Sequence, residues 1–288
     1  MKDFIISTDS TADLPLSYIE GNNLLIHPLH YIVDDIEYGT DIVELSPTDF
    51  YNSMRNEKMP TTCASNPEHI ENLMKKKIEE GYDILHISFS SALSCSYSNA
   101  VLSANKLMEE IPDAKIIVVD SLSATVGQGL MVYKAVQLKK NGKSIDEIAT
   151  WINENRQRLI HQFIVDDLFH LVRGGRLSKS TAIIGTALHI QPLLKVDREG
   201  KLSNIGKIRG RKKALKILVD NIKENTKGIC IDTVFISHAD CVEDAEFVAE
   251  RIKNMYNIEN IMISEISPTI GAHTGAGAVV VTYLANER

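Results

Sequence analysis

The sequence predicts an α/β protein built from two α/β domains, residues 1–160 and 161–288. The chain of 288 residues is long enough for one large or two ordinary domains. In the first half, short apolar runs alternate with helical patterns, which is typical of a largely parallel sheet. The second half has a less regular order, and the change near Leu159–Phe163 marks the predicted domain boundary.

Apolar runs and helix start signals define the elements of the first half. We predict strands at Phe4–Ser7, Leu24–Val33, Ile84–Ser88 and Lys115–Val119. We predict helices at Leu14–Glu20, Pro47–Asn56, Asn66–Glu80, Ser94–Glu109, Gly127–Lys140 and Ile145–Leu159. Ser46 followed by Pro47 fits the residue preferences of an N-cap and a first helical turn.

The second half contains shorter strands and one hairpin. We predict strands at Phe163–Val165, Gln191–Val196, Leu202–Lys207, Thr233–Ser237, Ile261–Glu265 and Ala278–Leu284. We predict helices at Ser178–Leu188, Arg211–Asn225 and Val242–Tyr256. The pair Glu199-Gly200 indicates the tip of a hairpin.

Composition excludes several classes of protein. Hydrophobic residues make up 44% and charged residues 24%, which is ordinary for a soluble globular protein. The net charge of −7 disfavours nucleic-acid binding. The four cysteines form no Cys-x-x-Cys pair, which argues against zinc and disulfide frameworks and fits the cytoplasm. No apolar run reaches the roughly 18 residues of a membrane span, and Asp9 comes too early for a signal peptide.

Hydroxyl-rich segments follow predicted strands or precede predicted helices, the usual place of ligands in open α/β sheets. The segment Thr8–Asp13 fits a helix cap, and we favour that interpretation. In Pro60–Pro67, capping by Ser65 or Asn66 leaves Thr61 and Thr62 unexplained. The segment Ser88–Ser98 holds six serines, more than one cap requires. Such hydroxyls can hold a carboxylate or a phosphate.

A histidine near the end of the chain is surrounded by very small residues. His273 lies in the segment Gly271–Gly277, where glycine lets other groups approach the backbone closely. The segment is either a tight turn before the last strand or a site for a small anion or a reacting carbonyl. Residue types alone leave both interpretations open.

Two basic segments stand out in an acidic chain. One is Arg173-Gly174-Gly175-Arg176, and the other is Lys207–Lys216, which has six cations and no acid. The second segment is either a solvated helix face or a docking surface for phosphate or an acidic partner. The phosphate-loop pattern Gly-x-x-x-x-Gly-Lys-Ser/Thr is absent, so no nucleotide site is predicted.

Taken in order, these segments resemble the DegV family of bacterial fatty-acid-binding proteins. The resemblance covers nearly the whole chain and rests on the segments Ser7–Pro15, Thr61–Pro67, Leu93–Tyr97, Val119–Gly129, Arg173–Ser178 and Gly271–Gly275. It implies two α/β domains with a long-chain fatty acid, C14–C18, in a tunnel between them. It also implies a carrier without catalytic residues, metal or cofactor, which presents the acid to a separate fatty acid kinase. The kinase would make acyl phosphate for phospholipid synthesis.

The same resemblance implies roles for individual residues. Hydroxyls matching Thr62 and Ser94 would hold the carboxylate, with His273 close by. Cys63 and Ser91 complete the expected head-group set. Arg173 and Arg209 are expected near the carboxylate or on the surface that faces the kinase.

The sequence departs from the common family pattern beside both hydroxyls. Thr62-Cys63-Ala64-Ser65-Asn66 replaces Thr-Ser-Gln-Pro-Ser, and Leu93-Ser94-Cys95-Ser96-Tyr97 replaces Leu-Ser-Gly-Thr-Tyr. Cys63 is a poorer hydrogen-bond donor than serine, and Cys95 adds bulk. The tunnel lining would come from ordinary apolar residues, for example in Ile183–Leu194, but each of these is an equally good core residue and we favour the core for each one singly.

Two other classes of function are compatible with these residues. One is a hydrolase or transferase that uses Ser94 with His273, although the Gly-x-Ser-x-Gly nucleophile pattern is absent. The other is an interaction protein whose basic residues Arg209, Arg211 and Lys212 dock an acidic partner without any ligand.

Overall fold

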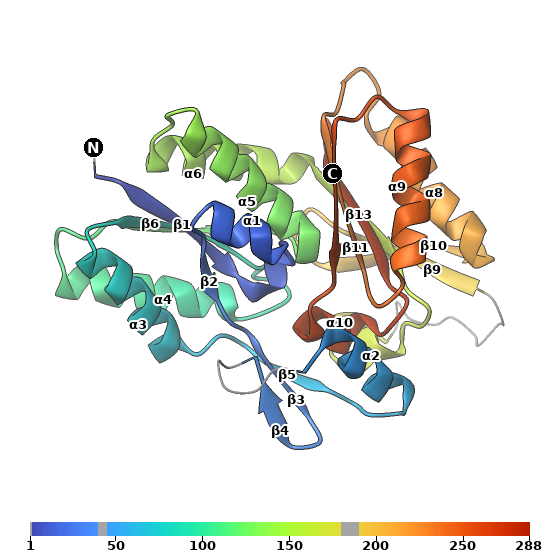
Figure 1. Ribbon diagram of the computed structural model, residues 1–288, viewed down its shortest axis with the longest axis horizontal. Coiled ribbons are helices and arrows are strands. Elements are labelled where there is room, and N and C mark those ends of the chain that lie inside the picture. The colour runs from blue at the N-terminus through green and yellow to red at the C-terminus, as the bar shows by residue number, and fades with distance from the viewer. Residues whose placement is uncertain (1, 40–44, 180–189) are drawn as a thin grey trace.

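The computed structural model describes residues 2–39, 45–179 and 190–288. It contains two main sheets and one small sheet, with helices packed on both sides of the first sheet (Figure 1). The α/β class and the two-part architecture are confirmed. Residues 180–188 of the predicted helix Ser178–Leu188, and residues 183–189 of the segment Ile183–Leu194, lie outside the described residues.

The first sheet is parallel throughout, as the β-α alternation predicts. Its order is β2 (Leu25–His27), β1 (Phe4–Asp9), β6 (Asp83–Ser88) and β7 (Ile116–Asp120). Helices α3 (Pro67–Glu79) and α4 (Ser96–Glu110) lie on one face. Helices α5 (Thr125–Lys140) and α6 (Ile145–Asn155) lie on the other (Figure 1).

Local capping explains where several helices begin. The predicted N-cap Ser46 accepts a hydrogen bond from the backbone N–H of Asp49 at 3.1 Å, and α2 (Pro47–Arg55) follows it. Asn66 caps α3 by accepting from the N–H of Glu68 at 2.9 Å. These bonds satisfy N–H groups that have no partner within the helix.

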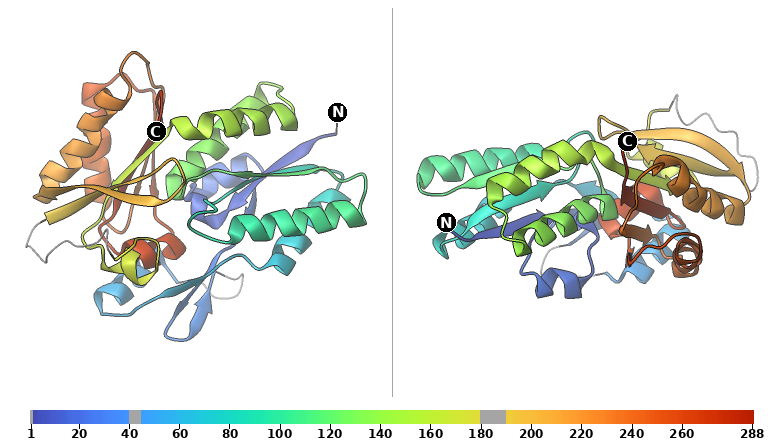
Figure 2. Two further views of the ribbon diagram at one scale, coloured as in Figure 1. Left: turned by 180° about the vertical axis from the view of Figure 1, so that it is seen from behind. Right: turned by 90° about the horizontal axis from the view of Figure 1, so that it is seen from above.

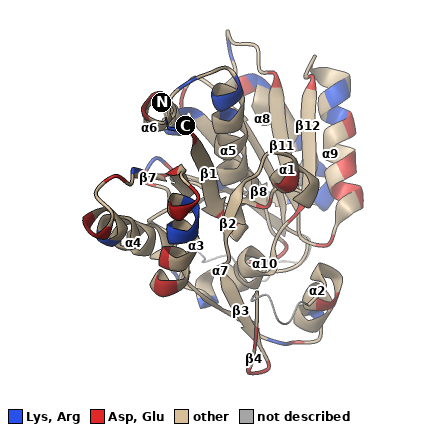
Figure 3. Ribbon diagram, turned by 60° about the vertical axis from the view of Figure 1, so that its left-hand side comes forward, with Lys and Arg blue, Asp and Glu red and all other residues tan. Residues whose placement is uncertain are grey.

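The second sheet is mostly antiparallel. Its order is β10 (Leu202–Arg209), β9 (Ile190–Val196), β8 (Leu159–Ile164), β13 (Val279–Leu284), β11 (Thr233–His238) and β12 (Asn260–Glu265). In this sheet, β11 and β12 pair in parallel, and β9 and β10 form the predicted hairpin. Helices α8 (Arg211–Asn225) and α9 (Val242–Met255) cover one face. Helix α9 carries acidic residues in its first turn and the basic residue Lys253 in its last, whereas the strands carry few charges (Figure 3).

Helix α5 lies between the two main sheets. It packs against β1 and β6 of the first sheet and against β11 and β13 of the second. Its buried side chains therefore surround the helix rather than form one stripe, and they include Val126, Leu130, Met131 and Val132. This arrangement places the first turn of α5 where the two halves meet.

An arm from the first half reaches the second half. The small sheet β4 (Ile36–Tyr38), β3 (His30–Val33) and β5 (Thr61–Cys63) lies in this arm together with α2 (Figure 1). The buried hydroxyl of Tyr51 donates to the carbonyl of Ile266 at 2.8 Å. Tyr51 therefore packs against the second half although it precedes residue 160. The division of the chain into domains at residue 160 stays a prediction.

The structure corrects three predicted elements. Leu24–Val33 is two strands in different sheets because Pro28 has no N–H for a ladder, and the N–H of Leu29 binds Ser10 Oγ at 3.0 Å. The helix predicted to run to Leu159 ends at Asn155, and Leu159 begins β8. The first part of the Gly271–Gly277 segment is helical and belongs to α10 (Pro268–Thr274), which is capped by Gly275 with a φ of 75°.

Candidate functional site

A cavity of about 280 Å³ lies between the two halves. Its walls come from the segments after β1, β5 and β6, from the start of α5, and from β8, β13, α7 (Phe169–Arg173) and α10. The rear view shows α7 beside α10 (Figure 2). The apolar residues on its wall are Leu29, Ala64, Phe89, Leu93, Ala124, Phe163, Leu171, Leu202, Ile270 and Val280.

Thr62 and His273 meet on the wall of this cavity. The Thr62 Oγ1 and His273 Nε2 atoms are 2.8 Å apart and share a hydrogen bond. Burial, together with the nearby Arg176 and Arg173, lowers the pKa of His273 to about 4. The imidazole is therefore neutral at neutral pH. Its Nδ1 atom is buried and has no hydrogen-bond partner among the described residues.

Gly174 allows His273 to take this position. A Cβ at residue 174 would overlap the Nδ1 atom of His273. The first residue of the double glycine is thus required here for the close approach of α7 to α10. Gly271 has a similar role because a Cβ there would overlap the ring of Tyr51.

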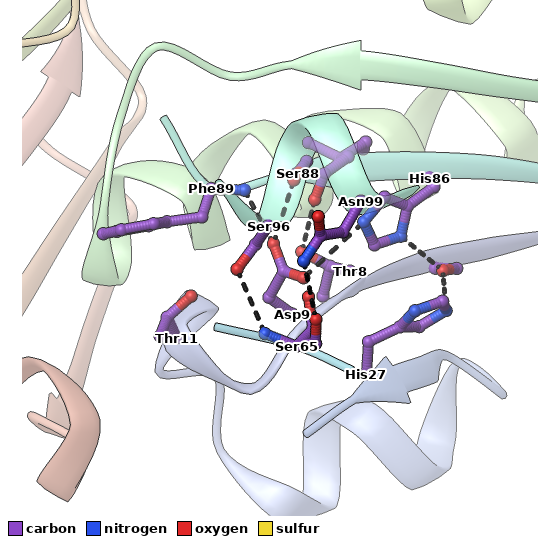
Figure 4. Close-up of polar contacts among 12 residues, drawn as sticks. Thr8, Asp9, Thr11, His27, Ser65, His86, Ser88, Phe89, Ser96 and Asn99 are labelled. Carbon is purple, nitrogen blue, oxygen red and sulfur yellow. Dashed lines mark hydrogen bonds and ion pairs between the residues drawn. The ribbon is translucent and has the colours of Figure 1, made fainter. Parts of the chain in front are cut away.

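Ser94 lines the cavity but does not contact His273 through a hydrogen bond. Its Oγ bonds to Ser96 Oγ at 2.9 Å and accepts from the Ser96 N–H at 3.2 Å. The N–H of Ser65 in turn donates to Ser96 Oγ at 3.4 Å (Figure 4). The structure therefore does not form the Ser94–His273 pair that a serine hydrolase requires.

The two remaining predicted head-group residues, Cys63 and Ser91, differ in whether they line the cavity. Cys63 lines the cavity and is exposed. Ser91 does not line the cavity in the described structure: it is exposed, and its N–H donates to Asp120 Oδ1 at 3.3 Å. The turn from Ser90 to Leu93 directs Ser91 away, since the Leu93 N–H bonds to the Ser90 carbonyl.

The arginine beside the cavity is Arg176, which the sequence interpretation passed over. Its Nε donates to the Leu93 carbonyl at 3.0 Å and its Nη1 to the Gly174 carbonyl at 2.6 Å. Among the described residues these bonds use two of five N–H donors, so others are available to an anion. The signal for Arg176 was its place immediately after the double glycine.

The two arginines that we did predict lie elsewhere. Arg173 does not line the cavity; its Nη2 donates to the carbonyls of Pro60 and Ala272, at 2.9 and 3.0 Å, and ties β5 to α10. Arg209 is exposed at the end of β10. In the basic segment, Arg211 is ion-paired with Asp166 at 2.8 Å and Asp244 at 2.6 Å.

The first hydroxyl-rich segment is not the helix cap that we favoured. Asp9 precedes a short 3-10 helix (Ser10–Ala12), but its side chain makes no capping bond. Its Oδ2 accepts instead from the N–H of Phe89 at 2.7 Å, and from Ser88 Oγ and Gln128 Nε2 at 3.2 Å each. These groups are buried between β1, β6 and α5 (Figure 4).

Histidines extend this buried network, which we call the Asp9 cluster: Ser7, Asp9, His27, His86, Ser88 and Gln128. Asp9 Oδ1 is 3.6 Å from His86 Nε2, and Ser7 Oγ lies 2.7 Å from His86 Nδ1 and 3.0 Å from His27 Nε2 (Figure 4). Burial raises the pKa of Asp9, but the His86 interaction and the Phe89 N–H outweigh it, so that the pKa lies below its usual value. The carboxyl group is therefore ionised at neutral pH.

The described residues contain neither a metal site nor a membrane-spanning helix. They contain no group of three or more His, Cys, Asp or Glu side chains arranged to hold a metal ion. None of the helices in residues 2–39, 45–179 and 190–288 is long and apolar enough to cross a membrane. Apolar walls with a few convergent polar groups are typical of small-molecule binding sites, and this cavity has the composition of a site for a small amphipathic ligand.

Comparison with known proteins identifies the family. A family model described as "Uncharacterised protein, DegV family" matches residues 3–286, so the chain belongs to the DegV family. A DegV domain-containing protein of Clostridium perfringens is 43% identical over 289 residues, covering 100% of this chain and 99% of the relative.

Solved structures of the family share the whole fold. A DegV lipid-binding protein from Thermotoga maritima is 28% identical with a TM-score of 0.87, and 99% of each chain is covered. The Bacillus subtilis DegV, described as a fatty-acid-binding protein, is 29% identical with a TM-score of 0.84, covering 99% of this chain and 100% of that one.

Proposed function

We propose that this protein binds a long-chain fatty acid, C14–C18, in the cavity between its two halves and presents the carboxylate to a separate fatty acid kinase. The observation that carries the proposal is the neutral His273, held by Thr62 on the wall of an apolar cavity with Arg176 nearby. The fatty acids bound by the structural relatives support it.

The acyl chain and the carboxylate of a fatty acid contribute to binding in different ways. Each CH₂ group that leaves water contributes about 0.8 kcal/mol, so some sixteen carbons give on the order of 10 kcal/mol before the costs of binding. The head group therefore needs orientation more than affinity. A carboxylate can accept hydrogen bonds from the hydroxyls of Thr62 and Ser94 and from the remaining N–H groups of Arg176. Leu29, Phe89 and other apolar residues of the wall would contact the acyl chain.

The proposed role is that of a carrier and not of an enzyme. Ser94 bonds to Ser96 and lacks a general base, so the cavity offers no activated nucleophile at this position. Phosphorylation would then be carried out by the partner kinase, which forms acyl phosphate for phospholipid synthesis. Arg209, Lys212 and Lys213 are exposed and supply the proposed docking surface. We propose a cytoplasmic location, which suits the four free cysteines.

Native mass spectrometry of the purified protein tests the ligand. We expect a co-purified C14–C18 acid and, after lipid removal, rebinding of palmitate. Thr62→Ala combined with Ser94→Ala should weaken palmitate binding about tenfold or more, because two donors to the carboxylate are lost. Ser91→Ala is the matched control and should bind palmitate normally, since Ser91 lies outside the cavity.

Two results would contradict the proposal. One is the absence of bound lipid together with no binding of added palmitate. The other is ester hydrolysis that disappears in Ser94→Ala, which would establish the enzyme instead.

A reconstituted kinase assay tests the partner. With ATP and a bacterial fatty acid kinase, the loaded protein should yield acyl phosphate, trapped as a hydroxamate with hydroxylamine. Arg209→Glu should reduce this yield and leave palmitate affinity unchanged. Equal yields with and without Arg209→Glu would reject the docking surface but not the ligand.

A further inference from the structure

The cavity reaches the protein surface beside two cysteine side chains. Among the described residues that line it, Cys63 and Cys95 alone are exposed, and the others are buried or half-buried. Both thiols are free. Two accessible cysteine residues therefore lie on the exposed part of the described cavity wall.

Each thiol is one residue from a proposed carboxylate contact. Cys63 follows Thr62 at the end of β5, and Cys95 follows Ser94 at the start of α4. The two segments are joined by the Ser65 N–H to Ser96 Oγ bond and by a bond from Asn99 Nδ2 to the Ser65 carbonyl at 2.9 Å (Figure 4). Because both cysteines line the cavity and are exposed, a group attached to either sulfur would lie beside the exposed part of the cavity wall.

We propose that Cys63 and Cys95 form a thiol modification site that closes the cavity to its fatty acid when either sulfur forms a mixed disulfide with a low-molecular-weight disulfide such as glutathione disulfide. The inference rests on the proposed function, since closure matters only if the cavity takes this ligand. It assigns the two cysteines a role in regulating ligand access.

The chemistry is thiol–disulfide exchange. The cysteine releases its proton to solvent, and the resulting thiolate attacks one sulfur of glutathione disulfide. A bond forms between the cysteine sulfur and that sulfur, the original S–S bond breaks, and the second glutathione leaves as a thiolate that takes a proton from water. Excess reduced thiol reverses the same step and frees the cavity.

Ligand and modification should oppose each other in both directions. A tripeptide on the rim occupies the entrance, and a bound head group shields the two sulfurs from reagents. Because such coupling is reciprocal, a tenfold loss of fatty-acid affinity on modification implies a tenfold weaker tendency of the loaded protein to be modified.

Thiol labelling tests the shielding. N-ethylmaleimide reacts with the delipidated protein and with the palmitate-loaded protein, and peptide mass spectrometry gives the rate at each cysteine. We expect bound palmitate to slow the labelling of Cys63 and Cys95, because the head group shields the two sulfurs from the reagent. Cys230 is the internal control, because it is exposed but lies outside this cavity, so its rate should not change. Unchanged rates at Cys63 and Cys95 in protein that holds palmitate would overturn the inference.

Binding after treatment with glutathione disulfide tests the closure. Palmitate affinity should fall about tenfold or more in the protein and recover on reduction. The double variant Cys63→Ser, Cys95→Ser should show the same affinity before and after treatment, whatever that affinity is. Unchanged affinity of the glutathione adduct rejects the inference alone, whereas no palmitate binding before treatment rejects the proposed function as well.

Discussion

Two groups of polar side chains are withdrawn from solvent in this protein, and they differ in what they face. The Asp9 cluster lies between β1, β6 and α5, and Ser7, His27 and His86 in it have no exposed surface. Thr62 and His273 instead line the cavity, as do Ser94 and Arg176. Both groups contain hydroxyls and histidine, so residue type does not separate them. Contact with the cavity, and not burial, therefore separates the residues of the proposed binding site from those of the Asp9 cluster.

The largest expected effect is on stability and comes from the Asp9 cluster. Asp9→Ala would leave the Phe89 N–H, Gln128 and His86 without their buried acceptor. We expect the free energy of unfolding to fall by about 3–5 kcal/mol, measured by urea denaturation. The exposed Asp113→Ala is the control and should change it by less than about 0.5 kcal/mol.

One result for Asp9→Ala would contradict a purely structural role of the Asp9 cluster. A variant that keeps its stability and loses palmitate binding would make the Asp9 cluster part of the binding site.

The next effect is on affinity and comes from the cavity arginine. Arg176→Met removes a charged donor while keeping much of the length of the side chain. We expect palmitate affinity to fall about tenfold to a hundredfold, as the loss of a charge-assisted hydrogen bond predicts, measured by isothermal titration calorimetry. Arg209→Met should bind palmitate normally because it lies outside the cavity. Equal affinities of the two variants would show that Arg176 does not contact the ligand.

The smallest effect is a pH dependence that reports on His273. Its pKa is 6.5 in the unfolded chain and about 4 in the folded protein, so between these values the unfolded chain binds more protons. The contribution of His273 to stability is therefore complete above the higher value and is lost as the pH falls. His273→Gln should keep the fold, and the stability difference between protein and variant should shift toward the variant from about pH 7 to about pH 5. A constant difference would show that the histidine titrates normally.

The pH dependence of palmitate affinity also reports on the protonation of His273. Because His273 stays neutral in the folded protein over this range, the affinity should not rise as the pH falls to about 5.5. A marked increase would indicate that a protonated imidazole binds the carboxylate.

Local signals explain which elements the sequence predicts well. The runs at β1, β6 and β7 are apolar and bounded by polar residues, and Ser46 and Asn66 mark the starts of α2 and α3 through their own caps. Helix α10 was missed because seven residues with a glycine have little helical preference of their own. That helix is held by distant contacts, among them its packing on α7 and the close approach of Gly271 to Tyr51.

The candidate site was predictable only where local residue types mark it. Excess hydroxyls directed attention to Thr62 and Ser94, and both line the cavity. The sequence could not tell Arg173 from Arg176, because α7 ends at Arg173 and the chain then turns at Gly175 with a φ of 74°. That change of direction, which is a property of the backbone, places Arg176 at the cavity.

The bond from Tyr51 to Ile266 has a consequence for how the protein is made. The two residues are 215 positions apart, and the carbonyl of Leu29 accepts from Thr269 across a still longer interval. During synthesis the chain emerges from its N-terminus, so the arm leaves the ribosome long before the surface that covers it exists. The Tyr51 side chain therefore stays without this partner until Ile266 has been made, and a segment near residue 266 completes the packing of one near residue 51.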